Sequence, residues 1–277
     1  MKNLFFPLNE ENNSAELKEI YLNRAFLYGD GFFESMRWHK NKISFYDDHF
    51  ARIQKSFEIL KLNATHLDKQ VLEQQIKSVI QAMDITNDAR VRLTFFRVAE
   101  GYYTPGNSKT ALLIQPQSWE NNEYLLNEKS ISMGVFRDHY KSSSSLSNIK
   151  SLNSLVYVLA GIYVKEKGWD DGIILNDLGN VCEATSSNLF IVKDEIIYTP
   201  QASDGCVEGV MRKQAIRFAK EAGIKLREKT LTVDDVKNAD EIFLTNGIRG
   251  FITVGNFEGR SYKTEMVKQL HSCLANI

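Results

Sequence analysis

The sequence predicts an α+β protein built from two subdomains with mainly antiparallel sheets. From Gly172 onward, short strand-like runs follow one another with tight turns between them, which is typical of antiparallel pairing. In the first hundred residues, amphipathic helical stretches lie between strand-like runs. A polar, proline-containing segment at residues 115–122 separates the two parts. We expect a functional site in the cleft between the subdomains, where cofactors commonly bind.

Composition excludes several classes of protein. The chain has 277 residues, of which 43% are hydrophobic and 25% are charged, as is ordinary for a globular protein. The formal net charge of -1 gives no reason to expect nucleic acid or an anionic membrane as a partner.

Cysteines and histidines indicate a cytoplasmic protein with no metal site. The three cysteines, Cys182, Cys206 and Cys273, are far apart and form no CxxC pair. The five histidines lack metal-ligand spacing. No apolar run approaches the roughly 20 residues that would cross a bilayer.

The first subdomain, residues 1–114, is expected to be a sheet with two helices. Residues 32–38 and 42–46 predict a hairpin, and Asp47 or Asp48 is the expected N-cap of the helix that follows. A second helix is predicted over 67–83, and strands over 90–98 and 109–115.

Residues 115–122 are interpreted as the linker and residues 123–277 as the second subdomain, which carries Lys150. A helix is expected after Lys150, with Ser151 as its cap and Gly168 at its end. The remaining predicted elements are strands at 131–136, 173–175, 180–184, 189–192, 196–198, 225–230, 241–244 and 251–254, and helices at 209–222 and 264–275.

Lys150 and Glu183 are the most informative residues. A lysine that can form an imine, together with a carboxylate that can hold a protonated ring nitrogen, is what a pyridoxal phosphate enzyme requires. Taken alone, each is more typical of a solvated surface.

Seven stretches give these two residues their context. They are Tyr28–Ser35, His49–Ile53, Lys150–Asn153, Glu183–Phe190, Thr199–Pro200, Gly209–Arg212 and Thr245–Asn246. With these stretches in this order, the chain resembles the class IV aminotransferases of the fold-type IV pyridoxal phosphate group, which include branched-chain and D-amino acid aminotransferases and 4-amino-4-deoxychorismate lyase. The resemblance implies pyridoxal 5'-phosphate as cofactor and a homodimer as the working unit.

The resemblance assigns roles to particular residues. Lys150 would carry the cofactor and move the α-proton, and Glu183 would hold the pyridine nitrogen protonated. A helix N-terminus supplies N–H donors for a phosphate, and arginine supplies a fixed positive charge. The expected phosphate ligands are Arg52, Gly209, Val210, Met211, Thr245 and Asn246.

Substrate contacts are expected from a second group of residues, for which an ordinary structural role is an equal alternative. Arg92 and Arg97 are five positions apart on one predicted strand, so they point to opposite faces and one of them can line the site. The other candidates are Phe33, Tyr103, Gly247 and Arg249.

The sequence leaves two reactions open, and both use the same catalytic residues. Transfer of an amino group from an amino acid to a 2-keto acid is placed ahead of aminodeoxychorismate lysis to pyruvate and 4-aminobenzoate, a step of folate synthesis. The compact length and Thr245-Asn246-Gly247 resemble the lyase, but its glycine- and arginine-rich segment is replaced at residues 97–103. D-specific transamination ranks behind both because the Arg-x-His pair is missing at residues 97–99. A non-catalytic cofactor-binding protein is a remote alternative.

A homodimer is also favoured by the aromatic residues near position 30. Phe26, Tyr28, Phe32 and Phe33 with Leu27 offer more apolar surface than a small subdomain easily covers. The alternative is that they fill the core of the first subdomain.

Overall fold

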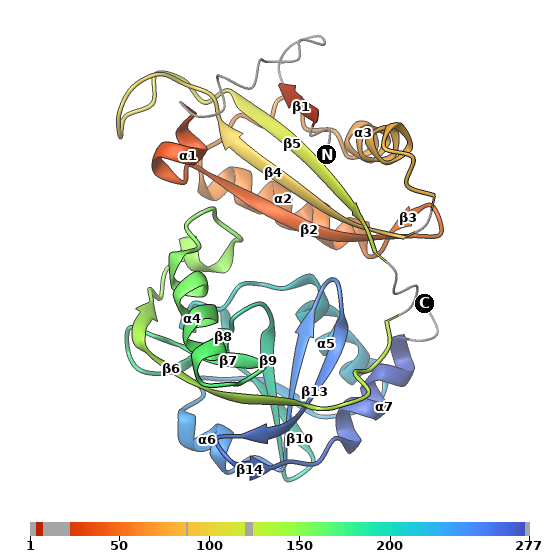
Figure 1. Ribbon diagram of the computed structural model, residues 1–277, viewed down its shortest axis with the longest axis vertical. Helices are drawn as coiled ribbons and strands as arrows, with labels where there is room; N and C mark the ends of the chain where they lie inside the picture. The colour runs from red at the N-terminus through yellow and green to blue at the C-terminus, as the bar shows by residue number, and fades with distance from the viewer. Residues whose placement is uncertain (1–3, 8–22, 87, 120–123, 275–277) are drawn as a thin grey trace. The chain divides into compact units, whose positions relative to one another are not determined.

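The computed structural model describes residues 4–7, 23–86, 88–119 and 124–274 (Figure 1). The chain divides into two units, Met1–Asn122 with Ile149–Asn153 and Glu123–Asn148 with Ser154–Ile277. Both units are α+β with mainly antiparallel sheets, so the predicted fold class is confirmed.

The first unit is an antiparallel sheet of order β1-β5-β4-β2-β3 with helices on one face. Alternate residues of β2 and β4, such as Phe32 and Phe95, stack and pack with Ile53 and Phe57 of α2 and Ile76 of α3. Figure 1 shows α2 running behind the sheet. The elements are β1 (Leu4–Pro7), α1 (Arg24–Tyr28), β2 (Gly31–His39), β3 (Lys42–Ile43), α2 (Tyr46–Ile59), α3 (Lys69–Ala82), β4 (Ala89–Arg97) and β5 (Thr110–Ser118).

The predicted N-cap of α2 was wrong. The cap residue is Phe45, whose φ of 54° is left-handed. Asp47 and Asp48 lie in the first turn instead, where the helix dipole favours negative charge. The aspartates therefore support the helix start electrostatically, without capping it.

The second unit has a larger sheet of order β11-β10-β9-β12-β13-β6-β7-β8, with β14 paired to β13. One face packs Phe136 and Ile174 against Ala160 of α4, and Phe251 against Phe218 of α5. The elements are β6 (Ile131–Lys141), α4 (Leu155–Glu166), β7 (Asp171–Asn176), β8 (Val181–Ala184), β9 (Asn188–Lys193), β10 (Ile196–Thr199), α5 (Val210–Glu221), β11 (Leu226–Glu228), α6 (Val233–Lys237), β12 (Glu241–Asn246), β13 (Gly250–Phe257), β14 (Arg260–Ser261) and α7 (Glu265–Leu274).

Three strand pairs of this sheet are parallel: β6 with β7, β6 with β13, and β10 with β11. The first pair is joined through α4, and parallel neighbours require such a crossover. The short helices α1 and α6 and the two-residue β14 were not predicted.

The expected linker begins too early. Residues 115–118 continue β5 and pair with β4. In the described part of the chain, β1 pairs with residues 111–114 and does not reach Pro116. Pro116 therefore lies at an edge of the sheet, where its missing N–H breaks no sheet hydrogen bond. In the rest of the expected linker, Trp119 is described, but residues 120–122 lie outside the described residues. Glu123, where the second subdomain was expected to start, also lies outside them.

The Lys150 segment joins the first unit, although the sequence placed it in the second subdomain. The Phe33 N–H donates to the Lys150 carbonyl at 2.8 Å, and the Leu152 N–H donates to the Gly31 carbonyl at 3.0 Å. β3 pairs only with the far end of β2, which leaves this edge of β2 for the segment. Helix α4 then begins with Ser154 as its cap residue, so the expected cap at Ser151 was wrong.

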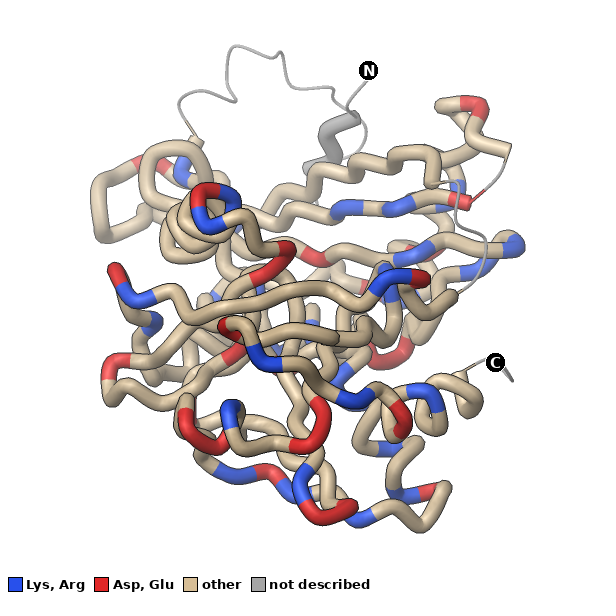
Figure 2. The backbone as a smooth tube through the Cα atoms, turned by 60° about the horizontal axis from the view of Figure 1, so that its bottom comes forward, with Lys and Arg blue, Asp and Glu red and all other residues tan. Residues whose placement is uncertain are grey.

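Acidic and basic residues are interspersed along the described backbone (Figure 2). In the described ranges, no helix is long and apolar enough to cross a membrane. Among the same residues, no group of three or more His, Cys, Asp or Glu side chains is placed to hold a metal ion.

Candidate active site

Lys150 lies on the face of the first sheet opposite the hydrophobic core. Its Nζ is 4.9 Å from the centroid of the Phe33 ring, and the guanidinium carbon of Arg92 is 3.7 Å from the same centroid. Burial lowers the pKa of Arg92, and the charge of Arg90 adds to the effect. The edge pairing of the backbone with β2 therefore brings the amine and a partly buried cation to one aromatic ring.

Arg52 is fixed by a buried carboxylate. Its Nε and Nη2 donate to Glu34 Oε1 and Oε2 at 2.6 and 2.8 Å, and His49 Nδ1 lies 2.8 Å from Oε2. Burial raises the pKa of Glu34, but the Arg52 charge and the His49 hydrogen bond outweigh burial and bring it down to about 2. The bidentate pair holds the guanidinium in one orientation.

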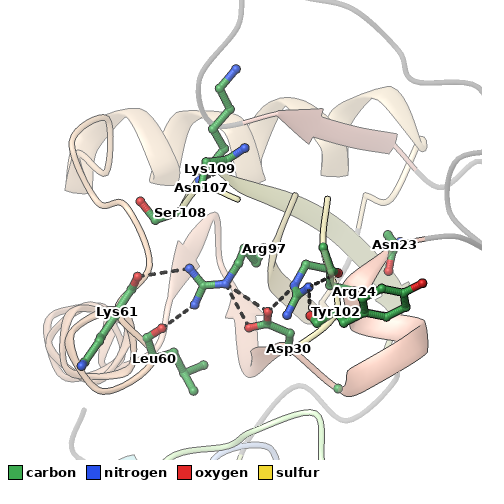
Figure 3. Close-up of polar contacts among 12 residues, drawn as sticks. Asn23, Arg24, Asp30, Leu60, Lys61, Arg97, Tyr102, Asn107, Ser108 and Lys109 are labelled. Carbon is green, nitrogen blue, oxygen red and sulfur yellow. Dashed lines mark hydrogen bonds and ion pairs between the residues drawn. The ribbon is translucent and has the colours of Figure 1, made fainter. Parts of the chain in front are cut away.

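Arg97 points to the opposite face from Arg92, as predicted, and its donors bond to neighbouring elements of the first unit. Its Nε donates to Asp30 at 3.0 Å, and its Nη atoms donate to the carbonyls of Leu60 and Lys61 at the end of α2 (Figure 3). The side chain is buried. These bonds tie the loop at Asp30 to α2, so the structure does not support the expected substrate contact of Arg97.

Arg24 completes this cluster. Its Nε donates to Asp30 at 2.7 Å, and its Nη1 donates to the carbonyls of Gly101 and Tyr102 (Figure 3). The loop that carries Tyr103 is therefore anchored through its backbone. The Tyr103 ring itself is exposed and lies 5.7 Å from the Tyr28 ring.

Glu183 is a buried carboxylate of the second unit, on the sheet face that α4 covers. Lys141 Nζ and the Tyr157 hydroxyl donate to its Oε1 at 2.5 and 2.6 Å. The Val207 N–H donates to Oε2 at 3.0 Å, and Asn188 Nδ2 lies 3.5 Å from it. Burial, and then the Glu183 charge, raises the pKa of Tyr157 well above its usual value, so its hydroxyl remains a donor.

Lys141 and Tyr157 were missed at the level of sequence. Lys141 ends a strand, and Tyr157 lies in the apolar stretch of α4, so each looks ordinary in the sequence. The available signal was a lysine nine residues before Lys150, at the start of a serine-rich segment. This signal does not identify Glu183 as the partner of Lys141.

The start of α5 has the features of an anion site. Its cap residue is Gly209, which has no side chain to accept a bond from the helix. The first N–H groups of a helix have no acceptor within the helix. A Cβ on Gly209 would lie 2.0 Å from Asn188 Oδ1, so the close approach requires glycine. The hydroxyls of Ser187 and Thr245 are buried and have no hydrogen-bond partner among the described residues. These unsatisfied donors fit an anionic ligand such as phosphate.

Asn246, Gly247 and Arg249 lie in the turn after β12. Asn246 Oδ1 accepts from the N–H groups of Ile248 and Arg249, and its Nδ2 donates to the Ser186 carbonyl at 2.9 Å. The side chain of Asn246 therefore holds the turn, which does not support the expected direct phosphate contact. The Gly247 carbonyl accepts from the Tyr124 hydroxyl, and Arg249 is exposed.

Each unit carries groups of the kinds that pyridoxal phosphate requires. The first unit supplies an amine at Lys150 and a fixed cation at Arg52. The second unit supplies a buried carboxylate at Glu183, the uncapped helix start and the unsatisfied hydroxyl of Thr245. Amine, carboxylate and anion site correspond to the aldehyde, ring nitrogen and phosphate of that cofactor.

Comparison with known proteins shows the family. Residues 31–257 match the amino-transferase class IV family, and the chain belongs to it. A putative branched-chain-amino-acid aminotransferase of Methanocaldococcus jannaschii is 30% identical over 267 residues, covering 93% of this chain and 89% of that protein.

Other relatives include both reaction classes. An aminodeoxychorismate lyase of Vibrio harveyi is 24% identical, covering 88% of this chain and 89% of that protein. A D-alanine aminotransferase of Bacillus licheniformis is 27% identical, covering 86% and 83%.

Solved structures show the same fold. A branched-chain aminotransferase of Thermoproteus uzoniensis with norvaline has a TM-score of 0.85 at 22% identity, covering 99% of this chain and 94% of that chain. An aminotransferase of Brucella abortus bound to the cofactor PLP has a TM-score of 0.78 at 22% identity, covering 99% and 97%.

Proposed function

We propose that this chain binds pyridoxal 5'-phosphate and transfers the amino group of an amino acid to a 2-keto acid. The observation that carries the proposal is the buried Glu183 carboxylate, held by fixed donors in the same unit as an uncapped helix start. The 30% identical relative supports transamination of branched-chain type.

Lys150 and Glu183 have separate roles in the proposed reaction. When bound, pyridoxal phosphate supplies a ring that accepts the electron pair left when the α-proton departs. Lys150 binds the cofactor through its amine and then carries the proton, as a general base must. Glu183 holds the proton on the ring nitrogen, and its burial removes the competition of water for that hydrogen bond.

The phosphate is bound by the Arg52 guanidinium, the N–H groups at Val210 and Met211, and the Thr245 hydroxyl. Charge and N–H donors together suit a phosphate better than either alone. Arg92 is the arginine proposed for the substrate carboxylate, because it shares the Phe33 ring with Lys150. Phe33 would then form an apolar wall beside the reacting carbon.

Aminodeoxychorismate lysis is the second candidate, supported by the relative of similar length from Vibrio harveyi. Purified protein incubated with amino acids and 2-oxoglutarate separates the two. Keto acid formation from L-amino acids supports the proposal, and D-amino acid turnover would instead indicate the D-specific class. Release of 4-aminobenzoate from aminodeoxychorismate with no transamination would overturn it in favour of folate synthesis.

We also propose a homodimer in the cytoplasm. On α4, the side chains of Leu155, Val158, Leu159 and Ile162 follow helical spacing on one face and are exposed, Leu155 by 76%. On α1, Phe26 is 74% exposed. Apolar faces of this kind mark protein interfaces. The unpaired thiols of Cys182 and Cys206 support a reducing compartment.

A further inference from the structure

Lys141 is a buried ammonium group with two acceptors. It is the last residue of β6 and is 7% exposed. Its Nζ donates to Glu183 Oε1 at 2.5 Å and to the Ser147 carbonyl at 2.9 Å. A charge buried this deeply is stable only with a partner of opposite sign and satisfied hydrogen bonds. Lys141 and Glu183 therefore keep each other ionised.

The two oxygens of Glu183 differ in how many donors they have. Oε1 receives both strong side-chain donors, Lys141 and Tyr157. Oε2 receives the Val207 N–H at 3.0 Å, while Asn188 Nδ2 at 3.5 Å is beyond the usual N–H···O range. Since each carboxylate oxygen accepts about two hydrogen bonds, Oε2 retains capacity for one more donor.

We propose that Lys141 and Tyr157 are positioning residues that keep Glu183 ionised and direct Oε2 to the ring N–H of the cofactor. The inference rests on the proposed function, since it assumes that the ligand of Glu183 is pyridoxal phosphate. Lys141 supplies the charge, and Tyr157 fixes the rotation of the carboxylate.

The surroundings of Glu183 offer no second positive charge among the groups that contact its carboxylate in the described structure. Burial raises the pKa of the neighbouring thiols, that of Cys206 to about 12, so both Cys182 and Cys206 are neutral at pH 7. Without Lys141, Glu183 would be a buried carboxylate with no counter-charge. Burial without a counter-charge disfavours the charged form of a carboxyl, so the variant should hold it protonated.

Infrared spectroscopy of the apo-protein tests the charge directly. At pH 7, Lys141→Met should show one protonated carboxyl more than the wild type, and Lys141→Met with Glu183→Gln should lack that band. Lys141→Arg should return the wild-type spectrum if it folds, as judged by circular dichroism. If folded Lys141→Met and the milder Lys141→Gln both keep the wild-type carboxyl band, the proposal is overturned.

Calorimetric titration with pyridoxal phosphate, in buffers of different ionisation enthalpy, tests the link to the cofactor. The Lys141→Met apo-protein already holds the extra proton, so it should take up about one proton fewer on binding than the wild type. Tyr157→Phe, which keeps the charge, should show the wild-type uptake but bind at least several-fold more weakly. Equal uptake by wild type and Lys141→Met would contradict the inference, and so would unchanged affinity of Tyr157→Phe.

Lys193→Met is the matched control. It removes a lysine from an exposed ion pair with Asp240 at the other end of β9, roughly 16 Å along the strand from Asn188. Its proton uptake and affinity should equal those of the wild type. A wild type that does not bind pyridoxal phosphate would refute the proposed function, whereas the infrared result would still report on Lys141 and Glu183.

Discussion

At the residue scale, a buried carboxylate lies beside a cation in each unit, Glu34 with Arg52 and Glu183 with Lys141, and these two pairs have opposite roles. Glu34 in the first unit is surrounded by Arg52 and His49, so the carboxylate orients the arginine. Glu183 in the second unit is held by Lys141 and keeps one oxygen with spare acceptor capacity. The ligand-binding group is thus the cation in one pair and the anion in the other.

Removal of Arg52 should reduce both cofactor affinity and stability. Charge-assisted bonds contribute roughly 1.5–3 kcal/mol, so Arg52→Ala should weaken pyridoxal phosphate binding by about one to two orders of magnitude. It also leaves Glu34 buried without its main counter-charge, which should cost about 3–5 kcal/mol of unfolding free energy. Cofactor titration and urea unfolding measure the two effects.

The double variant Arg52→Met with Glu34→Gln separates these effects. It removes both charges of the pair, so most of the stability should return. The phosphate affinity should stay low because the cation is still missing. Recovery of affinity together with stability would show that Arg52 acts through folding alone.

Stability should fall in acid because of Glu34. Its folded-state pKa of about 2 is below the ordinary value of 4.5, so its contribution is complete above pH 4.5 and is lost as pH falls towards 2. The loss should be on the order of 3 kcal/mol. Urea unfolding at several pH values measures it, and Glu34→Gln should have a flatter profile over the same range. An equally steep profile in that variant would assign the acid sensitivity to other groups.

The reactive residues were more predictable than the residues that support them. Lys150 and Glu183 lie in sequence stretches that identify the family, whereas Lys141 becomes meaningful only once β6 and β8 flank β7 in one sheet. The contacts of Arg97 likewise depend on tertiary neighbours. Its carbonyl partners at the end of α2 are 36 and 37 residues away in sequence.

At the scale of elements, backbone pairing and close approach position the reactive groups. The edge of β2 fixes the backbone at Lys150 through two hydrogen bonds. The start of α5 approaches Asn188 so closely that Gly209 tolerates no side chain. Asn188 in turn donates to the Val207 carbonyl at 2.7 Å, so the helix start and the Glu183 site share a support.

Gly209→Ala should therefore disturb the anion site. Its Cβ would displace Asn188 and shift the first N–H groups of α5, so cofactor affinity should fall by at least about tenfold, equivalent to ~1.4 kcal/mol. Gly161→Ala in α4 is the control, because nothing lies within 4 Å of its added Cβ. That change should stabilise the protein by up to about 1 kcal/mol and leave affinity unchanged. Equal affinities for the two variants in a cofactor titration would argue against a phosphate site at Gly209.

Most helices and strands were predicted close to their observed positions, and the errors have local causes. Hydrophobic periodicity located α2, α3, α4 and α5, but the ends of elements depend on tertiary neighbours. Pro116 suggested a linker, yet an edge position in β5 accommodates it. Polarity alone could not reveal that edge.

At the scale of the whole molecule, the apolar face of α4 leads to a prediction about assembly. The wild type should sediment at twice the monomer mass of 31.7 kDa at micromolar concentration. Val158→Glu places a charge in the exposed apolar face of α4 and should shift the protein towards the monomer. Val71→Glu on α3, where Val71 is 48% exposed, is a control that should remain dimeric. A fully active wild-type monomer would contradict the dimer.

The proposed function depends on a bond between the Lys150 amine and pyridoxal phosphate. Borohydride reduction of the cofactor-loaded protein, followed by peptide mapping, identifies the lysine that forms this bond. The pyridoxyl group should be found on Lys150, and Lys150→Ala should remain unlabelled while still folded by circular dichroism. A label on Lys141 or on any other lysine of the wild type, or no label despite a bound cofactor, would refute this role of Lys150.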